Sequence, residues 1–146
     1  MDFANTVVIR RSPHDVFEFL AEFENVPKWN YAIVETHKTS QGAVGVGTTY
    51  GQVRSLPSRS EEHFEITEFE PDHHLAIRGS VGPFEGTVSY TLESVDQGTR
   101  LTNAADLEGR GIMKVVAPLA TGRIREAVET NLGKLKDLLE ATSGAS

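Results

Sequence analysis

The sequence contains no cysteine in its 146 residues. Disulfide bonds and thiolate chemistry, whether nucleophilic or metal-binding, are therefore excluded. The 14 Lys and Arg residues are outnumbered by 21 Asp and Glu residues, which gives a formal net charge of −7. The basic residues form no cluster that would follow a phosphate backbone or an anionic membrane surface. We therefore expect no nucleic-acid partner and no stable membrane insertion.

Long apolar runs are also missing, since none approaches the roughly eighteen residues that a membrane-spanning helix needs. The opening stretch, MDFANTVVIRR, has neither the apolar core nor the cleavage site of a secretory signal. We therefore expect a cytoplasmic protein. The length suits one domain, which we place at residues 1–146, with a small polar tail at 143–146 that we expect to be disordered.

The longest helical pattern lies between Gly109 and Thr142. Apolar residues recur there at intervals of three and four, which predicts one amphipathic helix with one buried stripe. Pro118 has no N–H to donate and crowds the carbonyl four residues earlier, so we expect a kink or a separate first turn at this point. The stripe consists of Ile112, Met113, Val116, Leu119, Ala120, Ile124, Val128, Leu132, Leu135 and Leu139.

The first part of the chain predicts one strand and two short helices. Residues 3–10 alternate and are rich in β-branched side chains, as is typical of a strand. Ser12 followed by Pro13 is the pattern of a helix cap with proline in the first turn. Asn25 and Pro27 repeat that pattern, which predicts the second short helix.

Between residues 33 and 107 the hydrophobic period changes to two, and turn signals arrive about every ten residues, which predicts a meander of six strands. Tight turns at the Pro-Asp and Asp-Gln-Gly sequences place Ile66 opposite Ile77 and Leu92 opposite Leu101. Opposite charges then face each other on the other side of both hairpins. The sheet therefore has one apolar and one polar face.

One hairpin contains an irregularity that the pattern leaves open. In the register above, Glu68 falls on the apolar face and Phe69 on the polar face. Either a bulge or a position at the rim, near the turn, accounts for this inversion.

These elements predict an α+β fold in which a curved, seven-stranded antiparallel sheet, with two short helices after its first strand, wraps around a long C-terminal helix. A bent sheet touches a straight helix closely along only part of its length. We therefore expect a space between the concave face and the helix, and we expect function to reside there.

Several stretches together resemble a known family: SPHDVFEFLAEFENVPKW, GVGTTY, FEITEFEPDHHLAIRG, VSYTLESVDQGTRLT and a proline early in a long terminal helix. They resemble the START-like, helix-grip (SRPBCC) superfamily, in particular its bacterial branch labelled polyketide cyclase/dehydrase and lipid transport. The resemblance implies a deep, mostly apolar cavity under the terminal helix that takes up a hydrophobic or amphipathic small molecule. It implies no invariant set of catalytic residues.

The register places Tyr90 opposite Asn103 on the inward face. A phenol and an amide in an apolar pocket can orient a ligand's carbonyl or hydroxyl, or they can satisfy each other or a buried water. Trp29 and Tyr31 lie where this fold has the mouth of its cavity, although core packing explains them equally well. The residues that we expect to contact the ligand are Trp29, Tyr31, Tyr50, Phe64, Ile66, Ile77, Val88, Tyr90, Asn103, Met113, Val116, Ala120 and Ile124.

The sequence does not predict which face of the third strand points inward, because the loop after this strand does not determine its register. Tyr50, Gln52 and Arg54 share one face of this strand. If that face points inward, the cavity holds a cation suited to a carboxylate or phenolate ligand. We favour the outward orientation, because an unpaired buried charge is costly.

Histidines and glutamates near residues 61–74 suggest a metal site, but the pattern argues against one. His73 and His74 are adjacent on a strand and point to opposite sides, and His63 falls on the solvent face with Glu65. No Gly-x-Ser-x-Gly motif supports a nucleophilic serine, and the glycines at 42–47 precede a strand rather than a helix. We therefore expect neither a metal nor a cofactor.

The hypothesis that we favour is sequestration of a lipid, polyketide or isoprenoid-like molecule between the sheet and the helix. The alternative is a polyketide cyclase or dehydratase acting on the same class of ligand, with Tyr90, or an inward His or Glu, moving a proton. A module that acts only through protein contacts is disfavoured, because the outward residues of the last strands are polar. Homodimerisation is left open.

Overall fold

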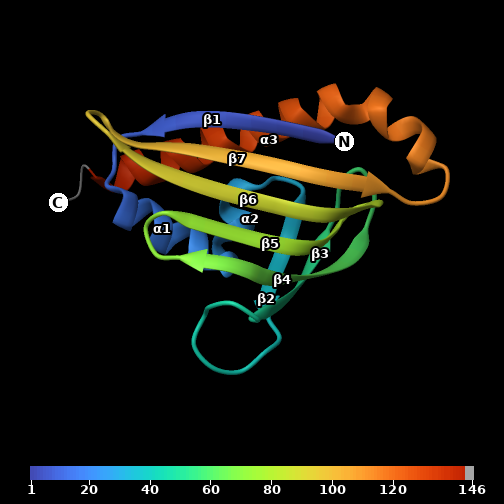
Figure 1. The fold of residues 1–146 in the computed structure, drawn as a ribbon, viewed down its shortest axis with the longest axis horizontal. Coiled ribbons are helices and arrows are strands. Elements are labelled where there is room, and N and C mark those ends of the chain that lie inside the picture. The colour runs from blue at the N-terminus through green and yellow to red at the C-terminus, as the bar shows by residue number, and fades with distance from the viewer. Residues whose placement is uncertain (144–146) are drawn as a thin grey trace.

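The computed structural model describes residues 1–143 and shows a curved antiparallel sheet with helices on its concave side (Figure 1). The strands lie in the order β1-β7-β6-β5-β4-β3-β2, so the first and last strands of the chain are neighbours. This confirms the predicted fold class. The elements are β1 Asp2–Ile9, α1 Pro13–Ala21, the 3-10 helix η1 Phe23–Asn25, α2 Val26–Trp29, β2 Ile33–Lys38, β3 Thr49–Arg54, β4 Ser60–Glu70, β5 His74–Val81, β6 Phe84–Val95, β7 Gly98–Gly109 and α3 Met113–Ser143.

Helix α1 begins as its sequence predicts. The Ser12 hydroxyl accepts a hydrogen bond from the Asp15 backbone N–H at 3.2 Å, and Pro13 occupies the first turn. The apolar residues of this helix that face the sheet are buried: Val16, Phe17 and Leu20. Helix α1 therefore closes one end of the concave face.

The strand pairing confirms the predicted register of both hairpins. Ile66 faces Ile77 in the β4–β5 pair, and Leu92 faces Leu101 in the β6–β7 pair. Tyr90 lies opposite Asn103, also as predicted. The inward face of these strands is therefore the apolar face that the alternation indicates.

A bulge resolves the irregularity in β4. The ladder shifts between Ile66 and Glu68, so the alternation inverts beyond that point. Phe69 then points inward, where its ring meets that of Phe17 at a centroid distance of 5.3 Å. Glu68 points outward and hydrogen-bonds the His74 ring at 2.7 Å. The bulge is thus the correct alternative, and it keeps the end of the strand amphipathic.

Two glycines face each other across the β5–β6 pair. Gly79 pairs with Gly86, and the same row continues to Phe64 on one side and Leu107 on the other. A Cβ on Gly79 would lie 2.2 Å from the His63 carbonyl oxygen, and one on Gly86 would lie 2.0 Å from that of Asp106. Only glycine fits this close approach of neighbouring strands. The missing side chains also leave space in the middle of the concave face.

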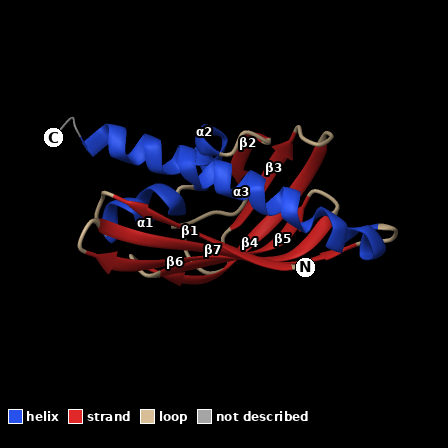
Figure 2. Ribbon diagram, turned by 90° about the horizontal axis from the view of Figure 1, so that it is seen from above, coloured by secondary structure: helices blue, strands red, loops and turns tan. Residues whose placement is uncertain are grey.

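Helix α3 lies over the concave side of the sheet, against β1, β7 and α2 (Figure 2). Its second half is buried as predicted, through Leu132, Leu135 and Leu139. Pro118 lies inside the helix, which continues through it, so of the two alternatives expected here, a kink or a separate first turn, the separate turn is excluded. Ser143, which we expected to be disordered, is the last residue of α3, and the rest of the predicted tail, 144–146, lies outside the described residues.

The predicted apolar stripe is only partly buried in the first half of α3, where Met113 and Ile124 are half-buried. Ile112, just before the helix, is 77% exposed, and Leu119 is 85% exposed. Figures 1 and 2 show the first turns of α3 projecting beyond the N-terminal end of β1. Ile112 and Leu119 therefore remain exposed although the periodicity of the sequence continues, whereas Met113 packs against Phe84 and Leu107 at the end of the sheet. None of the helices in residues 1–143 combines the length and the apolar character needed to cross a membrane.

Candidate functional site

A cavity lies between the concave face of the sheet, α2 and the second half of α3. The volume open to the centre of a water molecule is about 120 Å³, and the whole empty space, out through the mouth, is about 870 Å³. A single buried water needs only about 10–15 Å³ when volume is measured as the space open to the centre of a water molecule. The cavity is therefore much larger than the site of one water. Its walls include Gly79 and Gly86, so the glycine pair contributes directly to its room.

Seven of the residues predicted to contact a ligand line this cavity. They come from six different elements, which the register and the curvature bring together. They are Trp29, Phe64, Ile77, Val88, Tyr90, Asn103 and Ile124.

The other six predicted residues do not line it. Tyr31 follows α2, is 56% exposed and is not among the residues that line the cavity. Tyr50 and Ile66 are fully buried in the neighbouring core, where Tyr50 packs against both Phe23 and Phe64. The remaining three lie in the first half of α3 and are not part of the cavity lining: Met113, Val116 and Ala120.

Tyr50 carries a polar group that the core does not satisfy. Its hydroxyl is buried and has no hydrogen-bond partner within the described part of the chain. Burial, and next the charge of Glu24, raise the pKa of this hydroxyl to about 12, so it is neutral at physiological pH. It serves the packing of the aromatic core rather than the cavity.

Tyr90 is the phenol that faces the cavity. Its ring meets that of Trp29 edge to face at 6.5 Å, and the residue is 8% exposed. The hydroxyl makes no hydrogen bond to any residue in 1–143, and it is not sealed in the core as that of Tyr50 is. Burial raises the pKa of Tyr90 well above its ordinary value of 10, which keeps the group neutral and able to donate.

Asn103 supplies a fixed acceptor beside Tyr90. Its Nδ2 donates to the Ser89 carbonyl oxygen at 3.2 Å, so the amide is held by the neighbouring strand rather than by Tyr90. The two side chains therefore do not satisfy each other, which was one of our alternatives. The amide oxygen of Asn103 and the phenol of Tyr90 both remain available on the wall.

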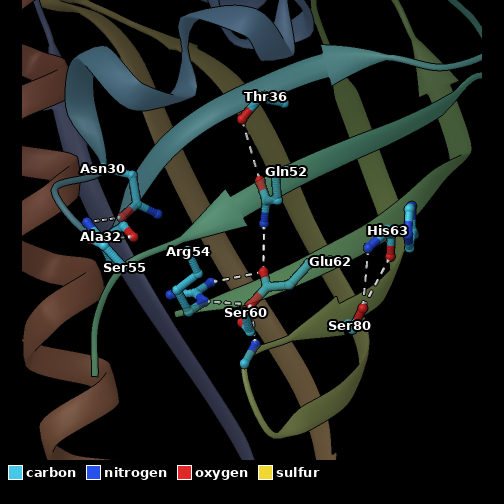
Figure 3. A network of polar contacts seen from close by, with 11 residues as sticks. Asn30, Ala32, Thr36, Gln52, Arg54, Ser55, Ser60, Glu62, His63 and Ser80 are labelled. Atoms are coloured by element: carbon cyan, nitrogen blue, oxygen red, sulfur yellow. Dashed lines mark hydrogen bonds and ion pairs between the residues drawn. The ribbon is translucent and has the colours of Figure 1, made fainter. Parts of the chain in front are cut away.

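The third strand points its polar face inward, so the outward orientation that we favoured is wrong. Gln52 and Arg54 line the cavity, and the Arg54 side chain is only 13% exposed. The cost that we assigned to an unpaired charge does not arise, because Arg54 is paired with Glu62 of β4 (Figure 3). The Glu62 side chain is 1% exposed.

Glu62 accepts five hydrogen bonds. Arg54 Nε and Nη2 donate at 2.6 and 3.3 Å, Gln52 Nε2 at 2.8 Å, Ser60 Oγ at 3.0 Å and the Gly82 N–H at 2.6 Å. Burial alone would raise the pKa of Glu62, but the Arg54 charge and these donors outweigh burial, so the pKa lies below its usual value of 4.5. Glu62 is therefore ionised and neutralises Arg54.

Sequence reasoning missed Glu62, although a signal for it was present. Glu61, His63 and Glu65 fall on the solvent face, so the alternation places Glu62 inward with Phe64. An inward glutamate beside a strand that carries an arginine predicts an ion pair between them. That pair would also have shown which face of β3 points toward the cavity.

The wall of the cavity offers few groups for proton transfer. Among the residues in 1–143 that line it, none is His, Asp or Glu, and only Arg54 and Tyr90 are titratable. The histidines lie elsewhere: His74 bonds Glu68 and Thr91, and His14 bonds Asp72 at 3.1 Å. Within the described ranges, no three His, Asp or Glu side chains gather as ligands for one metal ion.

Comparison with known proteins places the chain in one family. A family model described as polyketide cyclase / dehydrase and lipid transport matches residues 1–140. An uncharacterized protein of Mycobacterium tuberculosis is 22% identical over 129 residues, which cover 87% of this chain and 90% of that protein. The sequence relationship therefore extends over nearly the whole chain.

Solved structures with low sequence identity share the fold. A crystal structure of a Thermus thermophilus protein, TTHA0849, matches with a TM-score of 0.81 at 16% identity, over 98% of this chain and 99% of that one. The di-domain ARO/CYC StfQ from the steffimycin biosynthetic pathway matches with a TM-score of 0.79 at 12% identity, over 98% of this chain and 52% of that one. At these identities the likeness concerns the fold alone.

Proposed function

The chain belongs to the polyketide cyclase / dehydrase and lipid transport family of the START-like, helix-grip superfamily, and from this premise we propose that it binds a hydrophobic or amphipathic small molecule in the cavity under α3. The ligand is a lipid, polyketide or isoprenoid-like molecule. Its apolar part packs against the inward residues of the sheet and against Ile124 and Val128 of α3. Its polar part meets the phenol of Tyr90 and the amide oxygen of Asn103.

One observation carries this proposal. The cavity is mostly apolar, yet Tyr90 presents a hydroxyl to it that has no protein partner among residues 1–143. A buried polar group without a partner is costly, so an unpaired hydroxyl on a cavity wall indicates that water or a ligand completes its hydrogen bonds.

Apolar burial supplies enough free energy for such binding. Each methylene removed from water contributes about 0.8 kcal/mol, so eight methylenes contribute about 6 kcal/mol before the cost of ordering the ligand. The few polar groups then determine the orientation of the ligand rather than its affinity.

The chain contains its own reporter for this test. Trp29 is the only tryptophan in the sequence and lines the cavity, so its fluorescence should respond to any ligand that enters. We expect titration with fatty alcohols, aromatic polyketides and sterols to identify a binder, and native mass spectrometry to detect a co-purified small molecule. No response of Trp29 to any of these classes, with no retained molecule, would overturn the proposal.

A matched pair of variants shows whether the cavity is the site. Ala105 lines the cavity, whereas Ala104 is the preceding residue on the opposite face of β7. We expect Ala105→Leu to fill space in the cavity and weaken binding at least about tenfold, the order of effect of a misplaced side chain of this size. Ala104→Leu should leave binding unchanged, and equal effects of the two variants would place the ligand elsewhere.

A second candidate function is catalysis on the same class of ligand, as a cyclase or dehydratase. The family description and the fold shared with StfQ favour it, and Tyr90 is the one group placed to move a proton. Its raised pKa suits a proton donor but not a base, and the cavity wall carries no carboxylate or imidazole. We therefore rank binding above catalysis.

Replacing Tyr90 with Phe separates the two functions. In a binding protein, Tyr90→Phe removes one hydrogen bond, and the affinity should fall only about two- to tenfold. In an enzyme that uses this phenol, the variant should still bind its ligand but lose most of its turnover. Mass spectrometry of a flexible polyketide incubated with both proteins, beside a Trp29 titration, distinguishes these outcomes.

A further inference from the structure

We propose that the cavity selects ligands whose polar end is an uncharged hydrogen-bond acceptor, such as a ketone, ester or amide, over the free carboxylic acid of the same chain length. The inference rests on the proposed function and specifies the class of ligand. It follows from the way in which Arg54, the one cationic residue of 1–143 on the cavity wall, is neutralised.

Arg54 has one edge occupied and one nitrogen available. Its Nε and Nη2 form the two-pronged contact with the Glu62 carboxylate, at 2.6 and 3.3 Å. Nη1 has no partner among residues 1–143, and Arg54 lines the cavity. The guanidinium is planar and held rigidly by this pairing, so the direction in which Nη1 can donate is set.

Glu62 is held in place as firmly as Arg54. Arg54, Gln52 and Ser60 surround the Glu62 carboxylate (Figure 3). Together with the Gly82 backbone N–H, they account for both carboxylate oxygens. Gln52 is itself oriented by Thr36, whose hydroxyl donates to the Gln52 amide oxygen at 3.5 Å, so the Gln52 amide nitrogen is turned toward Glu62. Glu62 therefore cannot turn away from Arg54 without breaking contacts to three further residues.

The charges of this pair cancel at the cavity. An entering carboxylate would lose its hydration and find a cation that is already paired, so it would be a buried charge without a counterion. A carbonyl oxygen would accept a hydrogen bond from Arg54 Nη1 and leave the net charge of the site at zero. The site is therefore suited to neutral acceptors.

The decisive experiment compares ligands that differ only at the polar end. Trp29 fluorescence is followed during titration with decan-2-one, methyl decanoate and sodium decanoate at pH 7.5, below the concentration at which decanoate forms micelles. We expect both neutral compounds to bind at least about tenfold more tightly than decanoate. Tighter binding of decanoate would overturn the inference alone, whereas no binding of any member would overturn the proposed function and the inference with it.

Charge variants test the cause of the preference. Glu62→Gln keeps the size of the side chain but leaves Arg54 without its counterion, so decanoate should gain at least about tenfold relative to methyl decanoate. Glu61→Gln makes the same change on the exposed neighbour and should leave the preference as in the natural protein. An identical preference in both variants would overturn the inference.

A third variant covers the case in which Glu62→Gln does not fold. The double variant Arg54→Gln/Glu62→Gln removes both charges and leaves a polar, uncharged pair, so it should still prefer methyl decanoate to decanoate. A double variant that prefers decanoate would overturn the inference. Circular dichroism of each variant shows which of them are folded, and the comparison of ligands on the natural protein decides the question in every case.

Discussion

Glu62 links three parts of the sheet at the level of a single side chain. It receives donors from β3, from the start of β4 and from the β5–β6 turn, where Gly82 donates at 2.6 Å. Removal of one partner of a buried ion pair leaves the other charge uncompensated. Both the fold around β3 and the chemistry of the cavity therefore depend on this carboxylate.

We predict that Glu62→Ala lowers the free energy of unfolding by about 3–5 kcal/mol, because Arg54 is left buried without its counterion. Glu61→Ala, on the exposed side of the same strand, should change it by no more than about 0.5 kcal/mol. Urea titration followed by circular dichroism measures both. Similar losses in the two variants would show that the ion pair contributes little.

The same group makes stability depend on pH. The pKa of Glu62 is lower in the folded protein than its ordinary value of 4.5, so its stabilisation is complete above pH 4.5 and is lost as the pH falls through the folded-state pKa. Glu140 adds to this, because hydrogen bonds from Lys136 and Arg10 hold its pKa at about 2.

We expect the free energy of unfolding, measured in urea at pH 6.0 and pH 3.0, to fall on acidification. Glu62→Gln cannot be protonated at this position, so it should show a smaller fall than the natural protein. Glu140→Gln should reduce the part of the pH dependence of the unfolding free energy that Glu62 does not account for. An equally steep fall in Glu62→Gln would assign the acid sensitivity to other carboxylates.

At the scale of single residues, the sequence predicts which residues lie opposite each other on neighbouring strands better than it predicts whether a charged side chain is buried. Tyr90 and Asn103 were placed opposite each other from turn positions alone, and the structure confirms it. Arg54 was placed outward because its burial was weighed without a partner, although alternation already put Glu62 inward. The energy of one side chain depends on a neighbour that is distant in the sequence, and periodicity within one strand does not supply that neighbour.

At the scale of whole elements, α3 consists of two different halves. Leu135 is fully buried against the sheet, whereas Leu119 is 85% exposed although it continues the same apolar period. The period shows which residues share a face of the helix, but not how far the sheet extends beneath that face. This explains why Met113, Val116 and Ala120 were predicted to contact the ligand and do not line the cavity.

We predict that Leu135→Ala lowers the free energy of unfolding by about 2–5 kcal/mol, since it leaves a cavity in the core. Leu119→Ala should change it by about 0.5 kcal/mol or less, because its side chain already contacts solvent. Chemical denaturation of both variants gives the comparison. A large loss for Leu119→Ala would mean that the first turns of α3 pack against something in solution.

The β4 bulge illustrates a second limit of prediction at this scale. The inversion of Glu68 and Phe69 was visible in the sequence, but a bulge and a rim position both explain it. The choice is decided by the contact between Phe69 and Phe17, which lie on elements far apart in the chain. Strand patterns thus identify an irregularity, and tertiary packing determines its form.

At the scale of the whole molecule, ligand and fold are thermodynamically coupled. A ligand that occupies the cavity binds only the folded state, so it stabilises that state by about 2.7 kcal/mol at a free concentration of 100 times its Kd. For a chain of 146 residues this corresponds to a rise in Tm of roughly 5–10 °C.

We therefore expect methyl decanoate to raise Tm in a differential scanning calorimetry experiment in proportion to the logarithm of its concentration above Kd. Ala105→Leu, which fills part of the cavity, should show a smaller rise at the same concentration, while Ala104→Leu should match the natural protein. Equal shifts in all three proteins would indicate binding outside the cavity.

The order of the strands has a consequence for synthesis on the ribosome. β1 hydrogen-bonds only to β7 in the described sheet, and Arg10, just after β1, is bound by Glu140 near the end of α3. β1 must therefore wait until β7 and α3 have been synthesised before its native partners exist. Its alternating, β-branched residues have no partner strand during that interval, so we expect β1 to be a segment that a chaperone can protect.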